Sequence, residues 1–167
     1  NITDVQSIGE GLKTNNTLET LWLNDNNITD VQSIGEGLKT NNTLTKLRLC
    51  DNNITDDSGI QSIIDGLKTN NTLKYLLLPN NQLSDNMKSQ LNAIQQYKRD
   101  GSNGYQQVEG MKIWTADDEE ERAAYIKWEK EFNGKRRKRL EGKNLTDKDA
   151  LAIGELLKTN NTLKELY

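Results

Sequence analysis

A six-residue phrase, Lys-Thr-Asn-Asn-Thr-Leu, occurs four times in this chain of 167 residues and constrains its fold more than any other feature. The copies end at Leu18, Leu44, Leu73 and Leu163. Residues 5–18 and 31–44 are identical along their whole length. Hydrophobic residues make up only 33% of the chain, against about 45–50% apolar residues in an average globular domain. Because the polar residues recur in a fixed pattern, they indicate a repeat array rather than a disordered chain.

Leucines follow each copy of the phrase at constant spacing. Three units read Leu-x-x-Leu-x-Leu-x-x-Asn-x-Ile or Leu, beginning at Leu18, Leu44 and Leu73, so the period is 26 and then 29 residues. This pattern resembles that of leucine-rich repeat proteins, most closely the ribonuclease-inhibitor-like subclass, over about residues 1–100 and 140–167. The resemblance implies an α/β solenoid with short parallel strands on the concave face, helices on the convex face and helical caps.

Within each unit, alternation predicts a strand. Leu21 and Leu23 point into the core, whereas Thr20, Trp22 and Asn24 point outward. The resemblance implies that Asn26, Asn52 and Asn81 form a ladder in which side-chain amides bind backbone groups of adjacent turns.

Between the strands, apolar residues at helical spacing predict a helix over residues 30–39, with Thr29 or Asp30 as its N-cap. Gly35 and Gly37 weaken such a helix by about 1 kcal/mol each relative to alanine, so packing between units must stabilise it.

The chain divides into five parts. Residues 1–83 carry the repeats, and 84–100 form a C-terminal-type capping helix with Ser84 as its N-cap. Residues 101–110, with their glycines, are expected to be a flexible linker. Residues 111–143 form an N-terminal-type helical cap with a basic opening strand, and 144–167 a further, truncated repeat.

The predicted N-terminal-type cap has two notable patterns. Tyr125, Trp128 and Phe132 form one aromatic stripe on a helix, which favours cap packing over a ligand site. A basic run follows it, formed by Lys135, Arg136, Arg137, Lys138 and Arg139. This run is a candidate phosphate contact or nuclear-import signal. The alternative, a polar opening strand, is favoured because terminal repeats need a polar outer face.

The order of these parts is unusual, since an entry cap and its repeat follow the exit cap. A circular permutant, a fragment of a longer array, and ends that complete each other between chains all fit this order. The last reading predicts a homo-oligomer through open solenoid ends, by domain swapping, a ring or a filament. The self-associating residues would be Asn1, Ile2, Leu163, Leu166 and Tyr167.

Outward strand positions differ between units that are otherwise copied. The concave rows are Glu165, Thr20, Lys46 and Tyr75, then Tyr167, Trp22, Arg48 and Leu77, then Asn24, Cys50 and Pro79. The second row holds residue types enriched in binding hot spots and predicts a cation–π contact of Arg48 with Trp22. A protein-binding surface is the functional reading, and drift at unconstrained exposed positions is the alternative.

Composition narrows the function further. The chain has no histidine, a single cysteine and a net charge of −3, and it lacks phosphate-binding glycine motifs and calcium-loop spacing. We therefore expect no catalytic residues, no cofactor and no metal. Neither a membrane nor nucleic acid is expected as a partner, and a cytoplasmic location is favoured. The function predicted is a non-enzymatic protein-interaction scaffold, the alternative being a structural or engineered self-assembling module without a separate ligand.

Overall fold

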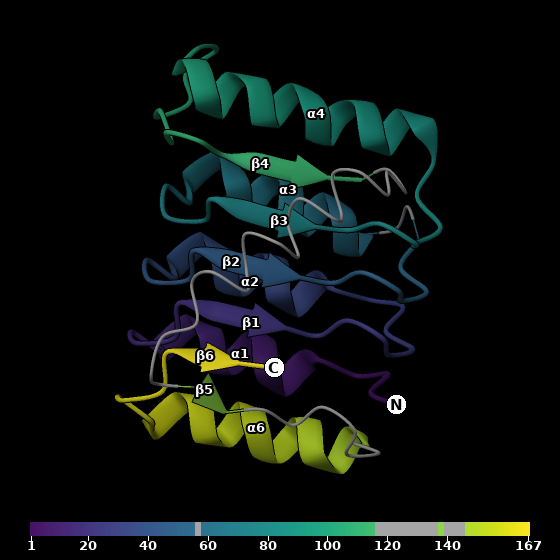
Figure 1. The fold of residues 1–167 in the computed structure, drawn as a ribbon, viewed down its shortest axis with the longest axis vertical. Helices are drawn as coiled ribbons and strands as arrows, with labels where there is room; N and C mark the ends of the chain where they lie inside the picture. The colour runs from purple at the N-terminus through teal and green to yellow at the C-terminus, as the bar shows by residue number, and fades with distance from the viewer. Residues whose placement is uncertain (56–57, 116–136, 139–145) are drawn as a thin grey trace.

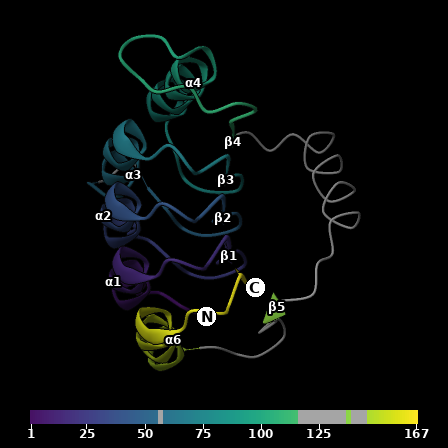
Figure 2. The same ribbon diagram turned by 90° about the vertical axis from the view of Figure 1, so that its left-hand side faces the viewer.

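The computed structural model describes residues 1–55, 58–115, 137–138 and 146–167. These residues form an α/β structure with one parallel sheet, in the strand order β4-β3-β2-β1-β6-β5 (Figure 1). The strands are β1 Thr20–Trp22, β2 Lys46–Arg48, β3 Tyr75–Leu77, β4 Lys112–Trp114, β5 Arg137–Lys138 and β6 Glu165–Leu166. The helices are α1 Gln6–Thr14, α2 Gln32–Thr40, α3 Ser58–Thr69, α4 Asp85–Asp100 and α6 Asp147–Thr159. All of these helices lie on one side of the sheet (Figure 2).

Strand register follows the leucine pattern. Leu47 lies opposite Leu21 and Leu76, and the row continues to Ile113 of β4 and to Leu166 of β6. All five are buried in the core between the sheet and the helices. The predicted alternation along the strands is therefore confirmed.

The helices also follow the predicted spacing, with a small shift at their start. Helix α2 begins at Gln32, and its N-cap position is Val31 rather than Thr29 or Asp30. The Asp30 side chain still accepts a hydrogen bond from the Gln32 N–H at 2.8 Å. In α4, Ser84 is the N-cap as predicted, and its Oγ accepts from the Met87 N–H at 3.3 Å.

Neighbouring helices approach so closely that only glycine fits at the contact. A Cβ placed on Gly9 would lie 2.3 Å from the carbonyl carbon of Ser33, and one on Gly154 2.3 Å from the carbonyl oxygen of Ser7. Real Cβ atoms essentially never come this close to backbone. The glycines that weaken the isolated helices thus allow neighbouring helices to pack closely.

The predicted ladder of Asn26, Asn52 and Asn81 is present. The Asn52 amide donates to the Leu23 carbonyl at 2.9 Å, and its Oδ1 accepts from the Ile28 N–H at 3.0 Å. Asn81 repeats both contacts one unit further on, at 2.9 and 3.0 Å.

A second asparagine ladder, not predicted from the sequence, runs along the carboxyl ends of the helices. The Asn41 amide donates to the carbonyls of Leu12 and Asn15, both at 2.9 Å. Asn70 repeats this pair with the carbonyls of Leu38 and Asn41. These asparagines belong to the recurrent six-residue phrase, which explains why the phrase is copied.

Residues 101–114 differ from the prediction. Instead of a flexible linker over 101–110, the structure has a turn after α4, and the Val108 N–H donates to the Lys98 carbonyl at 2.7 Å. Val108 and Met111 are buried, and Lys112–Trp114 adds β4 beside β3 rather than opening a helical cap at residue 111. The reason is the apolar character of Val108, Met111 and Ile113, which lets this stretch cover the end of the core.

The ends assigned to self-association meet within one chain. Strand β6 pairs with β1, with Leu166 opposite Leu21. Ile2, Leu166 and Tyr167 are buried, Leu163 packs against the core, and Asn1 is exposed. The apolar surface expected to join two chains is therefore covered within one, and homo-oligomerisation stays a prediction.

Among the described residues, the helices are too short or too polar for any of them to span a bilayer.

Candidate binding surface

The outer strand face is the side of the sheet turned away from the helices. We define it by the outward side chains Thr20, Trp22, Lys46, Arg48, Cys50, Tyr75, Leu77, Glu165 and Tyr167. The register confirms the predicted rows: Lys46 lies between Thr20 and Tyr75, and Arg48 lies between Trp22 and Leu77. Parallel pairing of copied units thus places the positions that vary side by side.

An aromatic and cationic cluster lies at the middle of this face. The Trp22 and Tyr167 rings meet edge to face, with centroids 3.9 Å apart and planes at 70°. The Arg48 guanidinium carbon lies 5.0 Å from the Trp22 ring centroid, which confirms the predicted cation–π contact. A second pair places the Lys46 ammonium 5.8 Å from the Tyr75 ring centroid.

The cluster carries a polar group with an unmet hydrogen bond. Trp22 Nε1 is buried and has no hydrogen-bond acceptor among the described residues. A buried donor left without an acceptor costs about 1–3 kcal/mol. The cluster would therefore gain free energy from an acceptor supplied by a bound group.

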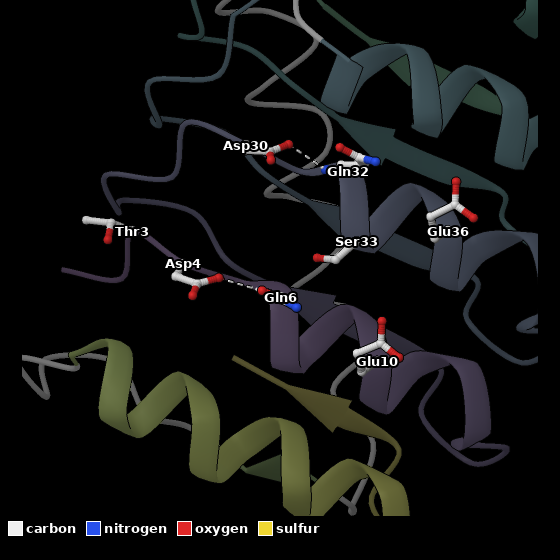
Figure 3. A pocket seen from close by; sticks show the side chains of 8 residues that line it. All are labelled: Thr3, Asp4, Gln6, Glu10, Asp30, Gln32, Ser33 and Glu36. Atoms are coloured by element: carbon white, nitrogen blue, oxygen red, sulfur yellow. Dashed lines mark hydrogen bonds between the residues drawn. The ribbon is translucent and has the colours of Figure 1, made fainter.

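A groove on the helix side is lined by carboxylates that are already engaged in contacts with the helices. It has a volume of about 510 Å³ and lies where α1 and α2 begin (Figure 3). Its lining residues are Thr3, Asp4, Gln6, Glu10, Asp30, Gln32, Ser33 and Glu36. Asp4 and Asp30 accept from the N–H groups of Gln6 and Gln32, and Glu10 and Glu36 pair with Lys13 and Lys39. All four carboxylates thus serve the helices, and they do not form a convergent acid–base pair.

In the part of the chain that the structure describes, no group of three or more Cys, Asp or Glu side chains could hold a metal ion. Cys50 is a free, buried thiol packed with Leu77 and Tyr75. It contributes to the outer strand face through packing.

A buried lysine, which sequence reasoning missed, ends the second asparagine ladder. Lys98 of α4 is fully buried, and its Nζ donates to the Asn70 carbonyl at 2.6 Å and to Asn71 Oδ1 at 2.8 Å. Burial lowers the pKa of this ammonium group from its usual 10.5. Lys98 thus takes the donor position that the next asparagine would occupy. The only feature of the sequence that could have indicated this role is the position of Lys98 in the last turn of the helix that follows the last full unit.

Several predicted residues lie outside the described ones. They are Tyr125, Trp128 and Phe132 of the cap and Lys135, Arg136 and Arg139 of the basic run. Arg137 and Lys138 form β5, opposite Glu165 and Leu166, which agrees with the predicted opening strand. The candidate phosphate contact stays a prediction.

Comparisons with known proteins place the fold but no family. Neither a family model nor a curated protein matches the chain. Among solved structures, the chain is similar to "Leiomodin-1 Actin-Binding Site 2 (ABS2)", with a TM-score of 0.54 and 18% sequence identity, over 77% of this chain and 80% of that chain. At this identity the likeness concerns the fold alone.

Proposed function

We propose that this protein is a non-enzymatic leucine-rich-repeat solenoid that binds another protein through its outer strand face. The observation that carries the proposal is the cluster of Trp22, Arg48 and Tyr167, three residue types favoured at binding hot spots, on neighbouring strands of one face.

The contrast between copied and varied positions supports this role. Helices α1 and α2 have the same nine residues, Gln-Ser-Ile-Gly-Glu-Gly-Leu-Lys-Thr, and both pack through glycine. The outer positions of the strands that follow them are Thr20 and Trp22 in one unit, and Lys46 and Arg48 in the next. A scaffold that only assembles would not need this variation on one face.

The unmet donor of Trp22 supports a polar as well as an apolar contact with the partner. A protein segment offering a carboxylate or carbonyl to Trp22 Nε1 and Arg48, and an apolar side chain to Leu77, fits the face. The leiomodin-1 neighbour is named for an actin-binding site, so a comparable fold is associated there with binding a protein. We carry over the class of role, and not actin itself.

The test is binding by variants of the face. The full chain, immobilised, is used to capture proteins from a cell extract, beside Trp22→Ala and Arg48→Ala. Leu151→Ala serves as the matched control, because Leu151 is an exposed apolar residue on α6.

Only a protein that both face variants lose and the control keeps is taken forward to calorimetry. We expect each face variant to bind it about 5-fold to about 150-fold more weakly, which corresponds to about 1–3 kcal/mol. Equal affinity of all four proteins would refute the proposal, provided that urea unfolding shows the variants to be folded.

A further inference from the structure

A tight turn after α4 holds an asparagine–glycine pair in an exposed position. The Tyr105 N–H donates to the Ser102 carbonyl at 3.0 Å across this turn. The two central residues, Asn103 and Gly104, have φ angles of 51° and 78°, and positive φ at both positions is the signature of a type I′ turn. Both residues are exposed, so the peptide bond between them is open to water.

The polar groups of this pair are not engaged elsewhere. Among the described residues, neither the Asn103 carboxamide nor the Gly104 N–H has a hydrogen-bond partner. A Cβ built on Gly104 would meet no atom within 4 Å, so no neighbour crowds this residue. The asparagines of the second ladder differ, because the Asn41 carboxamide donates to two carbonyls and accepts from the Leu44 N–H. The carboxamide of Asn103 is therefore available for reaction.

An asparagine followed by glycine has a known intramolecular reaction open to it. The backbone nitrogen of the second residue attacks the side-chain carbonyl carbon of the first, and the missing Cβ of glycine lets the backbone reach the required conformation. Here the new bond joins Gly104 N to Asn103 Cγ. The carboxamide nitrogen leaves as ammonia with the proton of the Gly104 N–H, and a succinimide ring remains. Water then opens the ring at either carbonyl, which gives aspartate or isoaspartate without oxidation or reduction.

We propose that Asn103 is a site of spontaneous deamidation in the folded protein, with water as the co-reactant. The reaction needs a local opening of the turn, and opening an exposed turn costs little free energy compared with global unfolding. Glycine follows asparagine at one other place in the sequence, Asn133, which lies outside the described residues. The inference concerns the chain alone and does not depend on a binding partner.

The modification would act on the end of the repeat array. Tyr105 follows the turn, and its ring stacks on that of Tyr97 with centroids 5.7 Å apart. The Nζ of buried Lys98 lies 5.6 Å from the Tyr105 ring centroid. Isoaspartate adds a methylene to the backbone and a negative charge, so we expect it to displace Tyr105 from both contacts. The stability of this end of the array would then fall as the protein ages.

Mass spectrometry of tryptic peptides measures the reaction. The full chain is incubated at mildly alkaline pH, folded and, in parallel, unfolded in guanidinium chloride. Trypsin releases Asn103 in peptide 100–112, apart from Asn133, and releases Asn92 of α4 in peptide 89–98. Deamidation adds about 1 Da, and fragment ions locate the gain. We expect Asn103 of the folded chain to react within about tenfold of its rate in the unfolded chain, and Asn92, which is exposed but precedes alanine, to stay unchanged.

The matched variant is Gly104→Ala, which keeps Asn103 and adds a Cβ beside the attacking nitrogen. Its deamidation should be about tenfold slower or more. Equal rates in this variant and the wild type would overturn the proposal. So would a folded chain that keeps Asn103 intact while the unfolded chain loses it, and this comparison needs no variant, so it stands if Gly104→Ala fails to fold. Neither result bears on partner capture, so this proposal and the proposed function can fail separately.

Discussion

Helix α1 packs against an equivalent helix on each side, and only one of these two junctions lies within a continuous stretch of chain. In the internal junction, α1 packs against α2, which follows it along the chain. In the terminal junction, α1 packs against α6, more than a hundred residues away (Figure 1). A Cβ at Gly9 would meet Ser33 at 2.3 Å in the first, and a Cβ at Gly154 would meet Ser7 at 2.3 Å in the second. Side-chain chemistry, and not chain order, therefore determines which units stack.

The asparagine ladder supports the same conclusion. At the internal junction, Asn41 donates to the carbonyls of Leu12 and Asn15 at 2.9 Å each. At the terminal junction, Asn15 donates to the carbonyls of Leu157 and Asn160 at 2.7 and 2.9 Å.

The two junctions differ in what supplements these contacts. At the internal junction, the Asn52 amide donates a hydrogen bond to the Leu23 carbonyl of the preceding unit. The terminal junction instead has the Asp147 carboxylate, which accepts from the N–H groups of Thr3 and Asp4. An ion pair between Lys164 and Glu19 adds to it. Polar side chains thus support the junction at which the backbone is not continuous.

The largest expected effect comes from glycine. Helix propensity alone predicts that Gly9→Ala and Gly154→Ala stabilise their helices by about 1 kcal/mol. Because the added Cβ would overlap backbone of the next helix, we expect each to lower the free energy of unfolding by about 3 kcal/mol instead. Urea unfolding measures this. A cost at Gly9 without one at Gly154 would mean that the terminal junction does not form.

The next effect comes from the second ladder. Asn41→Ala leaves the carbonyls of Leu12 and Asn15 without a side-chain donor. Asn15→Ala does the same to the Leu157 carbonyl and leaves the Asn160 carbonyl with the Thr17 hydroxyl as its side-chain donor. Each substitution should cost about 2 kcal/mol. Asn160→Ala is the matched control, since the Asn160 side chain accepts from Thr162 and Leu163 and makes only these local contacts among the described residues. Equal costs for all three substitutions would contradict a ladder between units.

These comparisons also show what sequence could and could not predict. The strand register and the contact of Arg48 with Trp22 followed from the period of the repeat, because a copied unit repeats its geometry. The Asn52 ladder was implied by the resemblance to leucine-rich repeat proteins. The Asn15, Asn41 and Asn70 ladder lies at a position that every copy shares, and the glycine contacts lie at one that α1, α2 and α6 share but α3 fills with Ile64. The roles of these positions become visible only when the helices face each other.

Strand β4 and buried Lys98 occur once each, so no period reveals them. Strand β4 and Lys98 both lie at the end of the repeat array, where side chains that occur in no other unit cover the core. The packing of α1 against α6 within one chain is the arrangement that a circular permutant implies. The order of the parts alone left it open beside a fragment of a longer array and ends that complete each other between chains.

At the end of the second asparagine ladder, the ammonium group of Lys98 takes the place of an asparagine amide. Burial lowers its pKa in the folded chain. Between that lowered pKa and the usual 10.5, the unfolded chain binds the proton more tightly, so unfolding takes up a proton. Raising the pH through this window should therefore stabilise the folded protein.

Lys98→Met lacks this titration, so its stability should change less between about pH 7 and about pH 10 than that of the wild type. Urea unfolding at both pH values measures the difference, and Lys88→Met, at a half-buried lysine of the same helix, is the control. Parallel pH profiles for wild type and Lys98→Met would contradict a desolvated ammonium at this position.

The smallest effect concerns the terminal junction in acid. Hydrogen bonds from the Thr3 N–H, the Asp4 N–H and the Thr3 hydroxyl lower the pKa of Asp147 below its usual 3.8. This contribution to stability is complete above pH 3.8 and is lost as the pH falls through the lowered value, since protonation removes the charged acceptor. Asp147→Asn should therefore reduce the acid sensitivity of the junction and raise the amide exchange rate of Thr3 at neutral pH.

Asp149→Asn is the control that distinguishes an effect on the terminal junction from an effect on helix α6 alone. Hydrogen bonds from the Thr146 N–H and hydroxyl likewise lower the pKa of Asp149, but its contacts stay within the start of α6. Its substitution should leave hydrogen exchange at Thr3 and Asp4 unchanged, whereas Asp147→Asn speeds exchange at both. If the amides of Thr3 and Asp4 exchanged at the same rate in the two variants, the carboxylate of Asp147 would not hold the two ends together. The terminal junction would then depend on the same glycine and asparagine contacts as the internal one.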